Sequence, residues 1–545
     1  MPEFVTELLG LLGGGAGFAV LKVAFVVFFG VAVMMVVSAP SPSAGKVTYG
    51  LLRVGTAALL LAVLAYQATW QVGGFGNRAF VRFLRRYNKR PNAAQVQVVR
   101  APILDRNGMV LAAPKRGEVW GRVYPLGEAA VHPVGYFHPR YGMTGVERLF
   151  DPVLSGYSDD ESLMAKARGV FTPRADEGAP VTLNIDQRLQ RKAYDLMAGQ
   201  RGAVVVMRPQ SGALLALVSS PGFDPNAPGP AAADGRALPA FNRAVQGRYP
   251  PGSTFKMLIA AAALTEGLSP AYDCPGGGYV ARGSPPIRDS EYYAYQRNGK
   301  VWPGWGRLGM RGAMAHSSNV YFAQLGVAAG GAAFNRMMAN ARINEQLPYI
   351  TAPDGSLRTA RGNAPEVTKN ATLAQLAIGQ GEVLVTPLHM ACFTAAIAAD
   401  GTMPRPRLGK DEPPERLGTL CTPQVAAQIR PMLREVVTGG TGAKAEIAGL
   451  EVAGKTGTAQ VPGAKDHAWF TCFAPAGRPN IVVTVLVENG GFGATAALPV
   501  AREVLKLADT LGYVRTAEGA GGSSECGVQS AECGVRSAEL AGAVP

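Results

Sequence analysis

Residues 249–264 read Y-P-P-G-S-T-F-K-M-L-I-A-A-A-A-L, a Pro-Pro-Gly turn followed by a serine, a lysine and a long apolar run. The Pro-Pro-Gly sequence stops the preceding chain, and the apolar run after it predicts a helix that is buried on every face. Ser253 then lies at the helix N-terminus, where free backbone N–H groups and the helix dipole favour a developing oxyanion. Lys256 follows one turn later on the same face and is the only charged residue between Ser253 and Leu264.

Lys256 gives this helix a possible chemical role. Lysines are rarely buried without a reason, and burial disfavours the ammonium form, so a lysine of lowered pKa could accept the proton of Ser253. Taken alone, the pair is better explained as a capping serine beside a snorkelling lysine. A second S-x-x-K, at residues 43–46 in a short Pro/Ser/Gly stretch, is interpreted as a chance occurrence.

A second motif, S-S-N at residues 317–319, strengthens the interpretation of Ser253 and Lys256 as a catalytic pair. Ser317 could relay a proton to a leaving amine, and Asn319 could hold a substrate amide. An ordinary helix cap would explain this motif if it stood alone. His316 is adjacent, but no Asp follows it as in a catalytic triad, so we interpret it as a bystander.

The third motif, K-T-G-T at residues 455–458, is typical of an edge strand. Gly457 has no side chain, so a peptide substrate could lie against the backbone there. Lys455 and the hydroxyls of Thr456 and Thr458 could bind a carboxylate. The N–H of Thr458, with that of Ser253, would form an oxyanion hole. A phosphate loop is the alternative, but no G-x-x-x-x-G-K-S/T pattern precedes the motif.

Together, the three motifs in this order predict a serine acyl-transfer site in which a lysine replaces the usual histidine base. The composition adds few constraints: 48% of residues are apolar, 17% are charged and the net charge is +14. A basic surface attracts nucleic acid, anionic lipid or anionic wall polymers. Nucleic acid is the weakest of these, because no zinc-knuckle spacing or basic–aromatic alternation occurs. The six cysteines show no metal-binding spacing, and we expect neither a metal nor another cofactor.

Changes in composition along the chain predict four regions. The first is membrane-like, with candidate transmembrane helices at residues 17–38 and 51–70. The last contains a degenerate seven-residue repeat with little apolar surface, which favours disorder. The predicted bounds are 1–95 for the membrane anchor region, 96–179 for a small β-rich pedestal, 180–515 for the catalytic domain and 516–545 for the low-complexity tail.

Within the catalytic region, strands at both ends and an Ala-rich helical middle predict an α+β fold with helices gathered around one antiparallel sheet. A turn at residues 209–212 joins two β-rich runs into a predicted hairpin. The expected strands are 202–207, 213–219, 455–461, 468–473 and 481–488. The expected helices lie within 182–200, 258–266, 370–399 and 498–511, the last with Pro499 in its first turn.

The three motifs and the segments around them resemble those of the class B penicillin-binding proteins. The resemblance covers roughly residues 96–512. Residues 242–244 and 249–256 are similar to the family's segment leading into the nucleophile, 379–388 to its G-Q-G-x-x-x-V-T-P-L signature, 468–470 to the strand after K-T-G, and 103–108 and 145–148 to its pedestal.

The resemblance implies a serine transpeptidase/β-lactamase-like domain that carries out D,D-transpeptidation. Ser253 would attack the penultimate D-Ala carbonyl of a peptidoglycan stem peptide, D-Ala would leave, and the amine of a neighbouring strand would take the acyl group. It implies that Ser253, Lys256, Ser317 and Lys455 are catalytic and that β-lactams acylate Ser253.

The resemblance also implies a location and a partner. The substrate is extracytoplasmic, so we expect a cytoplasmic (inner) membrane protein whose catalytic domain faces outward or into the periplasm. Residues 96–179 are too few for a glycosyltransferase domain. A separate membrane lipid II polymerase is therefore the expected partner.

Two other classes of protein remain as alternatives. The first is hydrolytic: a β-lactamase, a β-lactam sensor or a D,D-carboxypeptidase with the same motifs. A class A β-lactamase needs a deacylating glutamate in an E-x-x-L-N setting, and none occurs between Asn319 and Lys455. The second is an inactive scaffold of a wall-synthesis complex, which would have no chemical need for six intact motif residues.

Overall fold

The computed structural model describes residues 100–115, 121–156, 178–229, 238–353 and 355–515, together with residues 55, 58–59, 62 and 235. The predicted membrane anchor region, apart from these few positions, and the predicted tail lie outside the described residues. No helix within the described part of the chain combines the length and the apolar character that crossing a membrane requires.

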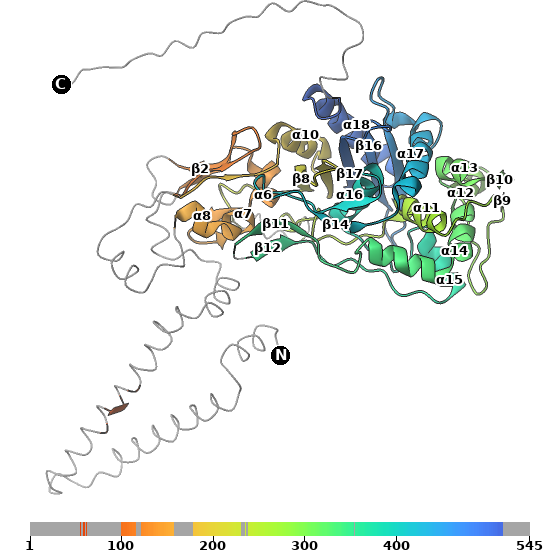
Figure 1. The fold of residues 1–545 in the computed structure, drawn as a ribbon, viewed down its shortest axis with the longest axis horizontal. Coiled ribbons are helices and arrows are strands. Elements are labelled where there is room, and N and C mark those ends of the chain that lie inside the picture. The colour runs from red at the N-terminus through yellow and green to blue at the C-terminus, as the bar shows by residue number, and fades with distance from the viewer. Residues whose placement is uncertain are drawn as a thin grey trace, which may run out of the picture.

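A five-stranded antiparallel sheet forms the centre of the catalytic region (Figure 1). Its strand order is β15-β16-β17-β7-β8, so the first hairpin of the region pairs with its last strands. The predicted hairpin is confirmed, and so is the edge position of the K-T-G-T strand. The strands are β7 (Gly202–Met207), β8 (Leu214–Ser220), β15 (Ala453–Ala459), β16 (His467–Ala474) and β17 (Ile481–Val487).

Helices cover both faces of this sheet, because the strands are apolar on both sides. In β7, Val205 packs into one core and Val204 into the other. In Figure 1, α10 and α18 lie above the strands, and α11 and α16 lie below them. These helices are α10 (Gln187–Met197), α11 (Lys256–Thr265), α16 (Pro387–Ala398), α17 (Pro423–Thr438) and α18 (Gly493–Thr510).

Helix α11 confirms the sequence reading, since every residue from Lys256 to Ala263 is buried. Two other helical predictions need correction. The expected helical stretch 370–399 is two helices, α15 (Asn370–Ala377) and α16, because the segment between them crosses to the nucleophile turn. Helix α18 begins at Gly493, so Pro499 lies inside the helix rather than in its first turn.

The pedestal contains a four-stranded sheet of order β3-β2-β1-β6 with short helices beside it. The edge strand β3 of the pedestal covers Arg122–Val123. The elements of the pedestal are β1 (Ile103–Leu104), β2 (Val110–Pro114), β3, β6 (Val181–Thr182), β4 (Phe137–His138), β5 (Gly142–Met143), η2 (Gly127–Ala130), α6 (Val131–Val134), α7 (Gly145–Leu149) and α8 (Asp151–Ser155).

Buried carboxylates hold the pedestal together and attach it to the catalytic domain. Glu147 accepts bonds from Arg100 and Arg122 and has no exposed surface. Asp105 is equally buried and accepts the backbone N–H of Gln187, in the first turn of α10, at 3.1 Å. The resemblance to the family pedestal at residues 103–108 and 145–148 thus falls on the two segments that carry these carboxylates.

The remaining elements surround the motif residues or join the two domains. They are η4 (Gly252–Phe255), β9 (Tyr272–Pro275), α12 (Ser290–Arg297), β10 (Gly304–Leu308), α13 (Met310–His316), α14 (Asn319–Asn340), β11 (Pro348–Ala352), β12 (Gly355–Arg358), β13 (Thr402–Pro404), β14 (Arg416–Thr419) and η5 (Ala443–Ala445). The hairpin β9–β10, with α12 between its strands, lies at the end of the molecule away from the pedestal (Figure 1).

Candidate active site

Ser253 lies in the 3₁₀ turn η4, immediately before α11, and is only partly buried. The turn packs closely on the edge strand β15. Gly252 has a φ of +54°, and a Cβ atom there would lie 2.5 Å from the carbonyl oxygen of Thr458. A side chain at residue 252 would therefore separate the two backbone segments that carry the expected oxyanion donors, Ser253 and Thr458.

The two lysines of the motifs meet at one hydroxyl group. Lys256 Nζ donates to the carbonyl oxygen of Ser317, to Ser317 Oγ at 3.3 Å and to Asn319 Oδ1 at 2.7 Å. Lys455 Nζ donates to the same Ser317 Oγ at 2.8 Å. The structure therefore brings these residues of all three motifs into one cluster beside the turn that carries Ser253.

Both lysines are fully buried, and this changes their proton affinity. Burial lowers the pKa of the Lys256 ammonium to about 7, although the carboxylates of Asp289 and Glu291 act in the opposite direction. Burial, and then the charge of Lys256, lower the pKa of Lys455 well below its ordinary value. Near neutral pH a substantial fraction of Lys256 is thus an uncharged amine that can accept a proton.

Asp289 is a residue of this site that the sequence analysis missed. Its buried carboxylate accepts the hydroxyl of Ser318 at 3.0 Å and the backbone N–H groups of Asn319 and Val320. It therefore caps the N-terminus of α14, where a negative charge is favourable. No local pattern marks it, because it lies 28 residues before Ser317.

Asn319 is held from both ends of its side chain. Its Nδ2 donates to the carbonyl oxygen of Arg288 at 2.9 Å, and its Oδ1 accepts from Lys256. The neighbouring Ser318 is the N-cap of α14, so a helix cap is present in this motif alongside the chemistry. Ser317, between the two helices α13 and α14, has a φ of +58°, which turns its hydroxyl group toward the lysines.

The K-T-G-T strand approaches the nucleophile turn through Gly457. A Cβ atom there would lie 2.8 Å from Thr254 Cγ2 and 3.2 Å from the carbonyl oxygen of Pro251. The expectation that this glycine leaves room for a substrate is therefore incomplete, since the chain's own turn η4 already needs the space. Thr456 Oγ1 is hydrogen-bonded to Thr441 Oγ1 at 2.7 Å, a partner that sequence reasoning did not identify.

The segment 379–388 supports the same turn from another side. The N–H of Gly252 donates to the carbonyl oxygen of Gly379 at 2.9 Å. Gln380 Nε2 reaches the carbonyl oxygen of Thr458 at 3.5 Å. The backbones of Tyr249 and Val385 exchange two hydrogen bonds of 2.9 Å. The G-Q-G-x-x-x-V-T-P-L signature thus braces the nucleophile turn against the edge strand.

The chain leading into the nucleophile is also fixed to the sheet. Glu488, directly after β17, accepts the guanidinium of Arg243 at 3.0 Å and the hydroxyl of Tyr249 at 2.6 Å. Trp469 on β16 donates its indole N–H to the carbonyl oxygen of Pro250 at 3.0 Å. These contacts give the nucleophile turn a rigid support, as acyl-transfer geometry requires.

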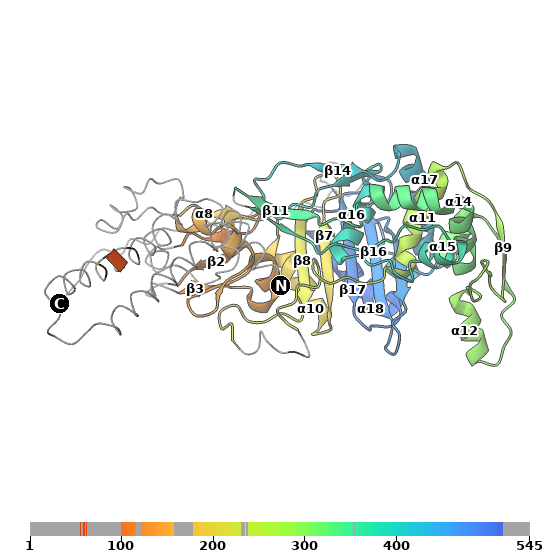
Figure 2. The ribbon, with the colours of Figure 1, turned by 90° about the horizontal axis from the view of Figure 1, so that it is seen from below.

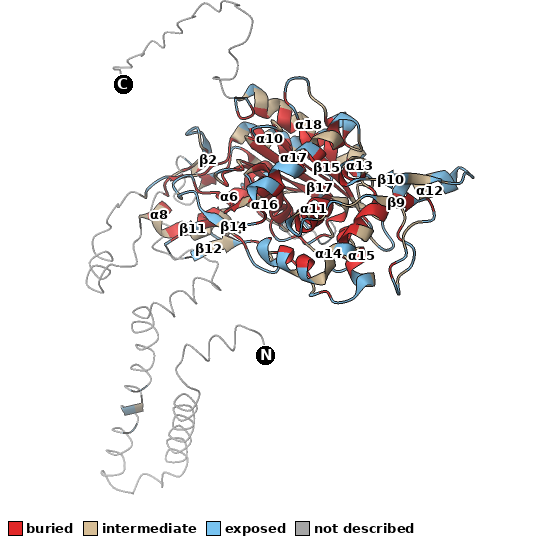
Figure 3. Ribbon diagram, turned by 45° about the vertical axis from the view of Figure 1, so that its right-hand side comes forward, coloured by how far each residue is buried: buried red, intermediate tan, exposed pale blue. Residues whose placement is uncertain are grey.

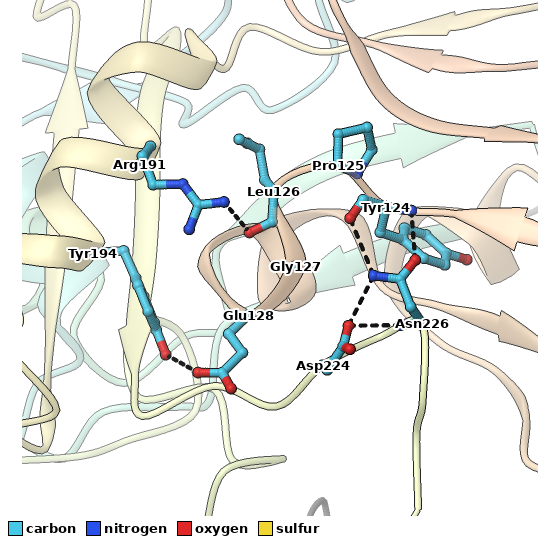
Figure 4. Close-up of a pocket in the computed structure, with 9 residues that line it drawn as sticks. All are labelled: Tyr124, Pro125, Leu126, Gly127, Glu128, Arg191, Tyr194, Asp224 and Asn226. Atoms are coloured by element: carbon cyan, nitrogen blue, oxygen red, sulfur yellow. Dashed lines mark hydrogen bonds between the residues drawn. The ribbon is translucent and has the colours of Figure 1, made fainter.

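A separate, open pocket of about 350 Å³ lies between the pedestal and α10 (Figure 4). Tyr194 donates to Glu128, Arg191 donates to the carbonyl oxygen of Leu126, and Asn226 bonds the backbone of the pedestal (Figure 4). Its polar groups are thus engaged with one another, and none of the motif residues lines it. We assign the chemistry to the motif cluster and not to this pocket.

The fold and the clustered motifs together define the class of serine acyltransferases. Comparison with known proteins agrees: residues 202–506 match the penicillin binding protein transpeptidase domain, and residues 100–181 match the penicillin binding protein A dimerisation domain. This chain therefore belongs to the penicillin-binding protein family, and the resemblance inferred from its motifs is confirmed.

Similar proteins occur in several bacteria. The peptidoglycan D,D-transpeptidase PbpA of Mycolicibacterium smegmatis is 33% identical over 425 residues, covering 71% of this chain and 84% of its own. The peptidoglycan D,D-transpeptidase MrdA of Haemophilus influenzae is 30% identical over 493 residues, covering 76% and 73%. Among solved structures, a ceftriaxone acyl-enzyme complex of penicillin-binding protein A from M. tuberculosis aligns with a TM-score of 0.66 at 30% identity, covering 76% of this chain and 98% of that one. The predicted serine transpeptidase fold is thereby confirmed.

Proposed function

We propose that this protein is a peptidoglycan D,D-transpeptidase that forms an acyl-enzyme at Ser253 and is acylated there by β-lactams. The observation that carries the proposal is the fully buried Lys256, whose pKa lies at about 7 and which contacts Ser317 and Asn319 beside the nucleophile turn. The named activity of the relatives and the acyl-enzyme structure of the M. tuberculosis protein support it.

The proposed acylation uses these groups in turn. Neutral Lys256 takes the proton of Ser253, and Ser253 Oγ attacks the penultimate D-Ala carbonyl carbon. The backbone N–H groups of Ser253 and Thr458 hold the oxyanion. The proton then passes from Lys256 through Ser317 Oγ to the leaving amine. The C–N bond breaks and D-Ala departs.

Deacylation is the same sequence in reverse with a different amine. The amine of a second stem peptide attacks the acyl carbon and gives up a proton through Ser317. That proton returns to Ser253 Oγ as the ester bond breaks. Lys455, with Thr456 and Thr458 on the same edge strand, is proposed to bind the terminal carboxylate of the donor peptide. Asn319 is proposed to hold the amide of that peptide besides positioning Lys256.

The proposed setting of this reaction is the outer face of the cytoplasmic membrane. The stem peptide is found there, and the sequence supplies two apolar segments before residue 95 that could anchor the chain. The pedestal is proposed as the connection to a separate membrane polymerase that supplies uncross-linked glycan. We propose no nucleic-acid partner.

The test is labelling of the purified protein with a fluorescent penicillin, followed over hours. We expect a long-lived adduct that disappears in Ser253→Ala. Ser43→Ala is the matched control, because it changes the other S-x-x-K of the chain, and its labelling should equal that of the wild type. Rapid turnover of the label would identify a hydrolase, and absence of label in the wild type would favour the inactive scaffold.

A further inference from the structure

The hairpin β9–β10 with α12 projects from the catalytic domain into solvent (Figure 2). None of the residues of α12 is buried, and Figure 3 shows this helix without any buried segment. A helix this short gains most of its stability from packing, so one with no buried face is unusual. Packing within the protein's own core therefore does not account for the exposed surface of this hairpin, which is available to a ligand.

The base of this projection nevertheless contacts the S-S-N motif of the candidate active site. Arg288 and Asp289, directly before α12, hold Asn319 through its side chain and its backbone N–H respectively. Arg288 also lies over the ring of Tyr292 in the first turn of α12, with 4.5 Å between its Cζ and the ring centroid. A ligand that lies along α12 would thus approach the wall of the site that carries the S-S-N motif.

A continuous row of rings runs along this projection toward the site. Tyr295 and Trp302 have ring centroids 4.8 Å apart, and Trp302 and Trp305 are 5.1 Å apart. Trp305 stacks on His316 at 3.9 Å with an angle of 17° between the rings. We call these four side chains, Tyr295, Trp302, Trp305 and His316, the aromatic ledge. Its inner end adjoins Ser317 in the chain, and Tyr295 at its outer end is 37% exposed.

Charge on the projection favours an anionic ligand. Arg282, Arg297 and Lys300 are exposed on it. Of its three acidic residues, Asp289 is buried under the S-S-N motif. Flat aromatic faces pack against the apolar faces of sugar rings, and guanidinium and ammonium groups pair with carboxylates. The combination suits a polymer that carries both sugars and acidic peptides.

We propose that the aromatic ledge binds the acceptor strand of peptidoglycan, the glycan chain whose stem peptide supplies the attacking amine. This rests on the proposed function. The arriving amine must lose its proton along the path by which the leaving amine gained one, and that path includes Ser317. The acceptor therefore approaches the acyl carbon on the Ser317 side, where the ledge begins. The donor peptide occupies the opposite wall, along β15.

The test separates acylation from transfer in the full-length protein. Tyr295→Ala and Lys300→Glu change the ledge and its charge without touching a motif residue. Tyr141→Ala, on the pedestal, is the control, because Tyr141 is exposed to a similar degree at 42%. Three rates are measured: acylation by fluorescent penicillin, transfer of a thioester-derived acyl group to a small D-amino acid, and transfer to soluble uncross-linked glycan strands.

In both ledge variants we expect the first two rates to stay within about twofold of the wild type and transfer to glycan strands to fall about tenfold. In Tyr141→Ala we expect all three rates to equal those of the wild type. Equal effects on all three rates, or none on transfer to glycan strands, would overturn the proposal. As a fourth measurement, transfer is repeated with a membrane polymerase present; ledge variants that lose only the stimulation by the polymerase would also overturn the proposal and would place a protein on the ledge. A wild type that is acylated but transfers to neither acceptor would instead contradict the proposed function.

Discussion

Two buried lysines donate to one serine hydroxyl in this protein, and the positive charges of the two lysines repel each other. Lys455 and Lys256 both contact Ser317 Oγ, so removing the proton from one relieves repulsion on the other. Burial alone lowers the pKa of Lys256 to about 7, so a neutral amine is available near neutral pH without a histidine. The charge of Lys256 in turn adds to the effect of burial in lowering the pKa of Lys455.

The first prediction concerns the pH dependence of acylation. Because Lys256 must be neutral to accept the serine proton, the rate of acylation by penicillin should rise with pH around a midpoint near 7, the pKa given by burial. The folded pKa is lower than the ordinary 10.5, so the unfolded chain binds more protons between these values, and the contribution of Lys256 to stability rises with pH across that window. A flat profile of rate against pH from 5.5 to about 9 would exclude Lys256 as the base.

The second prediction concerns Asp289 as a positioning residue. Asp289→Asn keeps the shape but removes the charge that raises the pKa of Lys256 and holds the S-S-N backbone. We expect acylation to slow about tenfold to a hundredfold, as for a lost charged hydrogen bond, and its pH midpoint to move to lower pH. Asp224→Asn, an exposed carboxylate on the catalytic domain, is the control. A slower reaction with an unmoved midpoint would mean that Asp289 is merely structural.

At the scale of elements, the site depends on how closely β15 and η4 approach each other. In Gly457→Ala the added Cβ would lie 2.8 Å from Thr254 Cγ2, so the strand or the turn must move. We expect a loss of about 1–3 kcal/mol of stability and a slower acylation. Thermal unfolding and penicillin labelling measure these two effects.

Gly477→Ala is the control for this substitution, because nothing lies within 4 Å of a Cβ at that position in the turn after β16. Its stability and its labelling should match the wild type. A Gly457→Ala protein that labels normally would show that the oxyanion donors do not need the close approach.

The elements that sequence predicted well are those whose pattern is local. Helix α11 is apolar on every face, and β7 and β8 are apolar runs joined by a turn, so each could be identified from its own residues. The start of α18 could not, because Gly493 begins a helix there through its packing against the backbone of Trp469 and Gly457, which are distant in sequence.

The residues of the candidate site likewise fall into those that a local motif predicts and those that depend on contacts between distant parts of the chain. Ser253, Lys256 and Lys455 could be proposed from the sequence because each lies in a short motif with a chemical reason. The structure brings the two lysines together at Ser317. Asp289 and Thr441 contribute through contacts across 30 and 15 residues, to Asn319 and Thr456 respectively. Spacing in one sequence cannot reveal such contacts. The close packing around Gly457 was invisible for the same reason.

At the scale of the whole molecule, Asp105 connects the pedestal to the catalytic domain. Its buried carboxylate accepts backbone N–H groups from Asn107, Met109 and Gln187. In Asp105→Ala these donors lose their partner, so we expect about 1–3 kcal/mol of destabilisation and faster proteolysis between the domains. Penicillin labelling of the surviving protein should stay close to normal, because no motif residue contacts Asp105.

Asp273→Ala serves as the matched control for this change. Asp273 is exposed on β9, away from the pedestal, and its carboxylate lies 3.9 Å from the guanidinium of Arg307, so its loss should leave unfolding and proteolysis unchanged. If Asp105→Ala unfolds and is cleaved like the wild type, the connection between the domains lies elsewhere.

The order of strands in the central sheet also bears on how the protein is made. β7 lies near the beginning of the catalytic domain and β17 near its end, and the two pair directly, from Val482 with Met207 to Val487 with Gly202. A growing chain on the ribosome therefore cannot close the sheet until almost the whole domain has been synthesised, and pairing over such separations is slow. Until then β15 has no completed sheet to join, and the proposed oxyanion donors of Ser253 and Thr458 are not held together. A nascent or prematurely terminated chain should consequently not be acylated by penicillin. The antibiotic should react only with chains whose synthesis is complete.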